Sequence, residues 1–150
     1  MNNPTLDDRP FLQVDAATAS ANVKTYLAFI HNLTTYVTDK QAYEGVVHPD
    51  AVFYDNPNLI NKVGQVRNSG KSLEGVAMGQ KILATQRYDF IEIVETGNKL
   101  VIECTWRGVM AIDAGHLKQG QELKAYICMI VEFKDGMIYT QRNYDCYVPF

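Results

Sequence analysis

Apolar residues recur at steps of three and four between positions 23 and 37, the spacing of one face of an α-helix. The stripe consists of Val23, Tyr26, Leu27, Ile30, Leu33 and Val37. Thr18 and Ser20 precede it, and both can cap a helix through a side-chain oxygen. The pattern predicts one long amphipathic helix that begins near residue 20.

Two shorter helices are expected after it. Asp39 can cap the first, whose apolar positions are Tyr43, Val46 and Val47, and Pro49 should end it together with His48. A short strand is expected at 51–55, and then a long loop at 57–71 that could cover a pocket mouth.

The third helix should run from a cap at Ser72 to about Gln86. Gly75 and Gly79 weaken it by roughly 1 kcal/mol each relative to alanine, so close packing is the expected reason for both.

The remainder of the chain predicts four long strands, at 88–95, 100–110, 122–133 and 137–147. Asp135 and Gly136 join the last two, and this pair between β-rich segments is a strong hairpin signal. Helices followed by a meander of strands indicate an α+β fold. We expect a single domain at 18–150 after an irregular arm at 1–17.

The last strand carries polar groups on both faces. Gln141, Asn143 and Asp145 alternate with Thr140, Arg142 and Tyr144. A strand that covers an ordinary core would keep one face apolar. The pattern indicates a lined cavity, although an edge strand with one solvated face would give the same alternation.

Composition excludes several classes of function. A net charge of −3 without a basic run argues against nucleic acid as a partner. No secretory signal or segment long enough to span a bilayer is visible. Three widely spaced cysteines fit reduced thiols in a cytoplasm. The three histidines have no metal-ligand spacing, and there is no Gly-rich phosphate loop, so neither metal nor cofactor is expected.

The order of elements, with Asp50-Ala51-Val52-Phe53-Tyr54-Asp55 and the motif Asp135-Gly136-x-Ile138 to Arg142-x-Tyr144, resembles the nuclear transport factor 2-like (NTF2-like) superfamily. Within it, residues 18–148 look most like the SnoaL-like polyketide cyclases. The resemblance implies a cone-shaped roll of three N-terminal helices on a curved, mainly antiparallel mixed sheet. It also implies a small hydrophobic ligand in the open end and a homodimer formed through the outer sheet face.

The resemblance allows the catalytic residues of family members to be matched, one by one, to positions of this sequence. Relative to ketosteroid isomerase, Asp55 resembles the base, His31 falls on the helix donor with Tyr26 as a substitute, and Met129 replaces the donor of the third long strand. A methionine cannot donate a hydrogen bond.

Two other relatives point to different residues. Tyr54 and Asn56 resemble the water-positioning pair of limonene epoxide hydrolase, whose remaining catalytic positions fall on Thr105, Arg107 and Cys146 and so differ in type. Asp145 resembles the acid or base of SnoaL-like cyclases. The segment from Arg142 to Asp145 is one residue shorter than the family's Arg-x-Tyr-x-Asp.

Strand alternation adds an independent expectation. Ile102, Cys104 and Trp106 share the apolar, inward face of their strand, so Trp106 should line a cavity wall, either stacking on a ligand or as core. Met129 should also face inward. On its strand the opposite face carries Tyr126, Cys128 and Ile130, which is too apolar for a solvated surface and indicates a dimer interface.

Three functions are compatible with these features. The first is a cofactor-independent isomerase, cyclase or lyase (dehydratase included) that acts on a small apolar carbonyl compound. Asp55 would take the proton, and Asp145 or Asn143, with Tyr26 or His31, would stabilise the oxyanion. Asp55 could instead only form a turn. The expected ligand-binding residues are Tyr26, His31, Tyr54, Asn56, Trp106, Met129 and Gln141. The alternatives are a non-catalytic binding protein and a scaffold with an inert cavity.

Overall fold

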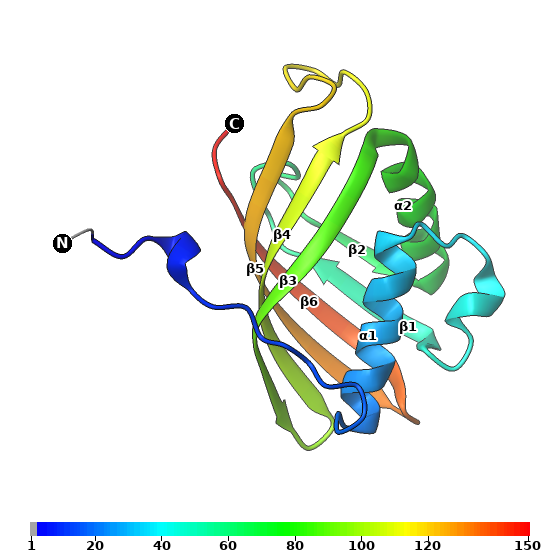
Figure 1. The fold of residues 1–150 in the computed structure, drawn as a ribbon. Coiled ribbons are helices and arrows are strands. Elements are labelled where there is room, and N and C mark those ends of the chain that lie inside the picture. The colour runs from blue at the N-terminus through cyan, green and yellow to red at the C-terminus, as the bar shows by residue number, and fades with distance from the viewer. Residues whose placement is uncertain (1–2) are drawn as a thin grey trace.

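The computed structural model describes residues 3–150 and has an α+β fold, in which two α-helices lie against a curved six-stranded sheet (Figure 1). The strand order is β2-β1-β6-β5-β4-β3. The helices are α1 (Ala21–Thr34) and α2 (Ser69–Ile82), with short 3-10 helices η1 (Leu6–Asp8) and η2 (Lys40–Tyr43). The strands are β1 (Val47–Asp55), β2 (Gln65–Asn68), β3 (Leu83–Thr96), β4 (Lys99–Met110), β5 (Glu122–Lys134) and β6 (Met137–Tyr147).

Helix α1 begins where the sequence predicts it. The Ser20 hydroxyl oxygen accepts a hydrogen bond from the backbone N–H of Val23, which satisfies one of the free donors of the first turn. Its apolar stripe buries Tyr26, Phe29 and Ile30 against the concave face of the sheet. No helix among residues 3–150 is long and apolar enough to cross a membrane.

The prediction of three N-terminal helices is wrong in two respects. Within the described chain the second helix is a single 3-10 turn, η2, and Val47, His48 and Pro49 belong to β1. Strand β1 pairs in parallel with β6, and the register shifts between Val47 and Val52. Proline is tolerated at such an irregularity because it interrupts the hydrogen-bond ladder there in any case.

The expected loop at 57–71 also differs. It contains β2, which pairs with β1 in antiparallel orientation and places Arg67 opposite Phe53. Helix α2 starts earlier than expected, because Asn68 rather than Ser72 caps it by accepting from the N–H of Lys71. It ends at Ile82, and β3 begins at once.

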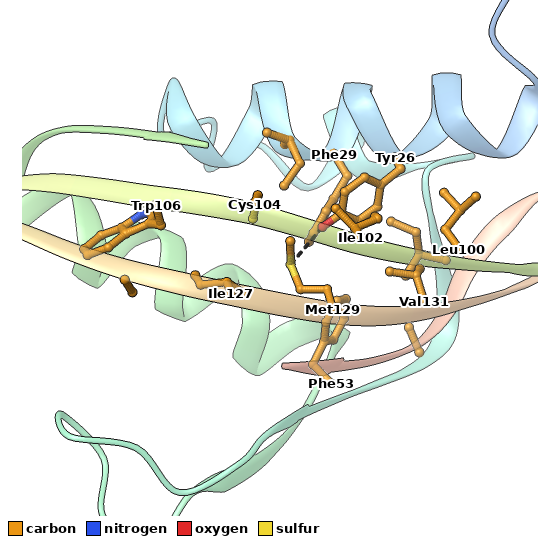
Figure 2. Close-up of a cluster of buried hydrophobic side chains, with 14 of the residues drawn as sticks. Tyr26, Phe29, Phe53, Leu100, Ile102, Cys104, Trp106, Ile127, Met129 and Val131 are labelled. Atoms are coloured by element: carbon orange, nitrogen blue, oxygen red, sulfur yellow. Dashed lines mark hydrogen bonds between the residues drawn. The ribbon is translucent and has the colours of Figure 1, made fainter. Parts of the chain in front are cut away.

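The four long strands form the antiparallel meander that the sequence predicts, and the one parallel pair, β1 with β6, makes the sheet mixed. Trp106 is 6% exposed on the inner face, as strand alternation predicts. Figure 2 shows it at one end of a row of core side chains beneath α1, with Cys104 and Ile102 following along β4.

The N-terminal arm crosses the outer face of the sheet. The N–H of Leu12 donates to the carbonyl oxygen of Phe90, and Arg9 forms an ion pair with Glu103. Asp7 contacts the Lys124 ammonium group and accepts from the Tyr126 hydroxyl. The arm therefore covers part of the surface on which a dimer interface is expected.

Candidate functional site

Two adjoining cavities lie between the helices and the sheet. The first, here called the inner chamber, has a volume of about 170 Å³, and the second, the outer chamber, about 530 Å³. Both are bounded by Phe29, Leu33, Phe53, Ser72 and Val76. The inner chamber is distinguished by a polar wall of Arg67, Gln86, Tyr88, Gln141 and Asn143.

The polar wall is organised by the pairing of β1 with β6, which sets Asp55 beside Asn143. The Gln141 amide donates to Asn143 Oδ1 at 2.8 Å, and this bond orients the Asn143 amide. Asn143 Nδ2 then donates to Asp55 Oδ1 over a long 3.4 Å. The Asn56 amide donates to the Asn143 backbone carbonyl at 2.8 Å and ties the end of β1 to β6.

Asp55 forms an ion pair with Arg67, which the sequence pattern does not place near it. Arg67 Nη2 lies 2.8 Å from Asp55 Oδ2, and Gln65 donates to the same oxygen at 3.0 Å. The Asp55 side chain is only 12% exposed. The apolar surroundings expected for a base are therefore absent, and Asp55 holds the guanidinium group in position.

Arg67 reaches this position by passing close to α2. A Cβ atom added at Gly75 would lie 2.8 Å from Arg67 Nη1, so close approach explains this glycine. Arg67 Nε is buried and has no hydrogen-bond partner among residues 3–150. The guanidinium group thus retains an unused donor beside the inner chamber.

Asp145 lies on the inner face of β6, two residues beyond Asn143 and opposite Ile127 of β5. Its Oδ1 atom is buried and has no partner in the described chain. Burial raises the pKa of Asp145 to about 6; the nearby negative charge of Asp55 adds to the rise and the positive charge of Arg67 opposes it. This is the most strongly perturbed carboxyl group of the site.

Tyr88 lines the inner chamber and is kept neutral. Burial raises its pKa well above the usual value for tyrosine, with smaller contributions from Cys104 and Asp145. Tyr88 pairs across the sheet with Trp106. Trp106 Nε1 donates to Gln86 Oε1 at 3.1 Å, so its indole N–H is already satisfied, and its ring meets Tyr147 edge to face.

The other sequence-predicted residues occupy varied positions. Met129 lines the inner chamber, and the fully buried Tyr26 directs its hydroxyl at Met129 Sδ over 3.0 Å (Figure 2). His31 is exposed because it lies on the outer side of α1, away from the buried stripe. Tyr54 is 40% exposed because it alternates with the inward Phe53. The structure brings neither His31 nor Tyr54 to the chambers.

Sequence reasoning missed Arg67, Gln86 and Tyr88. Arg67 falls in the segment expected to be a loop, Gln86 at the expected end of the third helix, and Tyr88 in a strand whose inward face the sequence pattern leaves open. Pairing of β3 with β4 aligns Tyr88 with Trp106, so extending the alternation argument across that hairpin would have placed it inward. In the described part of the chain, no three His, Cys, Asp or Glu side chains are grouped as metal ligands.

Comparisons place this architecture among known folds. No protein-family model matches the sequence, and no curated protein matches it either. Among solved structures, IdmH from Streptomyces antibioticus, a candidate polyketide cyclase, is similar with a TM-score of 0.68 at 18% identity, covering 83% of this chain and 91% of IdmH. A candidate SnoaL-like polyketide cyclase from Jannaschia sp. CCS1 gives 0.66 at 14% identity, covering 89% and 90%.

Two further solved structures are similar to this chain. An LEH-like epoxide hydrolase from M. tuberculosis matches with a TM-score of 0.63 at 15% identity, covering 83% of this chain and 82% of the hydrolase. An NTF2-like protein from Burkholderia pseudomallei K96243 gives 0.66 at 14% identity, covering 85% and 92%. The chain therefore has the NTF2-like fold, in the form shared by SnoaL-like polyketide cyclases.

Proposed function

We propose that this protein is a cofactor-independent isomerase, cyclase or lyase that acts on a small, largely apolar carbonyl compound, with Asp145 as the group that moves a proton. The observation that carries the proposal is the buried, unpartnered Oδ1 atom of Asp145 on the face that bears the polar wall. A pKa of about 6 lets this carboxyl group accept and release a proton near neutral pH.

This assignment differs from the one that the resemblance to ketosteroid isomerase implies. Asp55 Oδ2 is already engaged by Arg67 and Gln65, so this oxygen is not free to take a proton from a substrate. Asp55 is better suited to positioning Arg67. Its negative charge also disfavours ionisation of Asp145, as expected for two carboxyl groups that share a site.

Three donors of the polar wall are suited to stabilise an oxyanion. Arg67 Nε is unpartnered in the described chain, Asn143 Nδ2 makes only a long bond, and Tyr88 offers a neutral hydroxyl group. Fixed donors in a partly dry cavity stabilise developing negative charge without reorganisation of solvent.

The proposed step is a proton abstraction. The Asp145 carboxylate takes a proton from the carbon next to the carbonyl, the C–H electron pair moves into the enolate, and the negative charge develops on the carbonyl oxygen. Asp145 then returns the proton to another carbon in an isomerisation. In a cyclisation the enolate carbon instead attacks a second carbonyl carbon, the π electrons of that carbonyl move to its oxygen, and the resulting alkoxide takes the proton back from Asp145. The similarity to candidate polyketide cyclases supports this class of substrate.

A non-catalytic binding protein is the second candidate. Neither Asp55 nor Asp145 is among the residues that line the two chambers, which favours a site that binds without turnover. Under this alternative the polar wall would fix the orientation of a ligand, and the raised pKa of Asp145 would be a consequence of burial alone.

Exchange of deuterium from solvent into the α-carbon of simple ketones distinguishes the two. We expect the wild-type protein to accelerate this exchange, followed by proton NMR, and Asp145→Asn to reduce the rate about 10²–10⁴-fold. Asp50→Asn, which removes an exposed carboxyl group elsewhere on β1, should leave it unchanged. Ligand binding without exchange in the wild-type protein would favour the binding protein.

A further inference from the structure

We infer that the ligand of this site is elongated, with its carbonyl end in the inner chamber and an apolar chain extending into the outer chamber. The inference rests on the proposed function, because it assigns the substrate class of that same site. Its basis is the size, the shared boundary and the contrasting linings of the two chambers.

The inner chamber is too small to hold a typical ligand alone. Its volume of about 170 Å³ lies below the roughly 300–1,000 Å³ of most ligand pockets, whereas the outer chamber, at about 530 Å³, lies within that range. A molecule that used only the polar wall would therefore be small and bury little apolar surface. A ligand of ordinary size must use the outer chamber as well.

The two chambers adjoin at an aromatic boundary, called here the junction, that belongs to both. Phe29 of α1 and Phe53 of β1 stack with their ring centroids 5.8 Å apart, and both rings bound both chambers. Val76 of α2 also lines both chambers. A chain that leaves the inner chamber would pass along these apolar surfaces without meeting a buried charge.

The two chambers differ in the polarity of their linings, so each suits a different part of the ligand. Beyond the junction the outer chamber is walled by Tyr43, Val47 and Leu73, while Lys40 and Glu44 supply its charged groups. The polar wall of Arg67 and Asn143 belongs to the inner chamber. Hydrogen-bond donors at one end and apolar walls over the remaining length suit a ketone with a long hydrocarbon chain.

A series of methyl ketones of increasing chain length tests the inference. Each methylene buried in the outer chamber should lower Kd roughly fourfold, until the chamber is filled and the affinity reaches a plateau. Leu73→Trp should occupy part of the outer chamber and move the plateau to shorter chains. Met78→Trp places the same ring on the exposed side of α2, where Met78 is 55% exposed, and should leave the series unchanged.

Leu73→Ala provides the opposite change and does not depend on the tolerance of α2 for a tryptophan. It enlarges the outer chamber and should extend the plateau by one or two carbons. Binding is measured by calorimetry, and circular dichroism checks that each variant is folded. An affinity independent of chain length, or a plateau that neither Leu73 variant moves, would overturn the inference.

The binding series and the deuterium exchange test the elongated ligand and the catalytic function separately, so one can be rejected without the other. Chain-length dependence that responds to Leu73, without exchange that depends on Asp145, would retain the elongated ligand and reject the catalytic function. Asp145-dependent exchange with no effect of Leu73 would retain catalysis and reject the outer chamber as part of the site.

Discussion

Arg67 and Asp55 form an ion pair, 2.8 Å between Nη2 and Oδ2, that joins β2 to β1 at the edge of the inner chamber. The pair acts on a third residue, since Arg67 lowers and Asp55 raises the pKa of Asp145. The protonation of Asp145 is therefore set by burial and adjusted by two opposite charges. Changing either charge alone should shift it in a known direction.

Arg67→Gln should raise the pKa of Asp145 above its wild-type value of about 6, because the cation that favours the carboxylate is lost. Asp55→Asn should lower it, because the repelling charge is lost. Carbon-13 NMR titration of the Asp145 carboxyl group measures both. Arg87→Gln breaks the exposed pair with Asp89 and serves as the control. Shifts of the same sign in the two site variants would contradict this account.

Asp145→Asn should change the pH dependence of stability. The folded-state pKa is raised, so between about pH 4 and pH 6 the folded protein binds more protons than the unfolded chain. The wild-type protein therefore loses stability as pH rises through this window, and the variant lacks this loss. We expect the free energy of unfolding of the variant, relative to wild type, to increase by about 1–3 kcal/mol between pH 4 and pH 7.

Urea unfolding at the two pH values measures this difference. Comparing the same variant at both pH values cancels any cost of burying an amide at this position, because that cost does not depend on pH. A variant whose stability relative to wild type does not change with pH would show that Asp145 is not perturbed by burial.

The sequence predicts those parts of the fold that depend on local patterns. The start of α1 follows from Ser20 and the apolar stripe, and the bounds of β6 follow from the Asp135-Gly136 hairpin. The parallel pairing of β1 with β6 joins segments about 90 residues apart and leaves no local signal. Without this pairing, the local pattern at His48 and Pro49 predicts the end of a helix.

The same limit applies to the site. Gln141 and Asn143 could be assigned to a cavity because their alternation on one strand is visible in the sequence. Arg67 could not, because its role depends on β2, a strand of four residues that exists through its pairing with β1. The position of Asp55 after a short strand suggests a base, but the sequence does not show that Arg67 forms an ion pair with its carboxylate.

Gly75→Ala and Gly79→Ala on α2 should differ although both replace glycine by alanine in one helix. Gly79→Ala should stabilise the protein by roughly 0.5–1 kcal/mol, because alanine favours the helix and its Cβ would lie an ordinary 3.8 Å from Tyr36. Gly75→Ala should gain less or lose stability, because its Cβ would displace Arg67, which Asp55 holds in place.

A double-mutant cycle isolates the cause. In an Arg67→Gln background, Gly75→Ala should recover the gain seen at Gly79, because the shorter side chain no longer fills that space. Urea unfolding measures all four proteins. An equal effect of Gly75→Ala in both backgrounds would mean that contact with Arg67 does not explain this glycine.

The outer sheet face should mediate a homodimer. Val101 and Ile130 are paired across β4 and β5, and Cys128 and Tyr144 across β5 and β6, which gathers four apolar side chains beside the N-terminal arm, with Glu103 and Arg142 next to them on the same face. Tyr144 is 45% and Val101 37% exposed, and a patch of this kind is commonly covered by a partner. We expect a dimer in analytical ultracentrifugation at micromolar concentration.

Tyr144→Glu should convert this dimer to a monomer, because two carboxylates related by a two-fold axis would be desolvated and would face like charge. Val63→Glu introduces the same charge at a site that is 87% exposed and outside the sheet, and should leave the dimer intact. Circular dichroism confirms that both variants are folded. A wild-type protein that sediments as a monomer, or a dimer that both variants leave unchanged, would exclude this face as the interface.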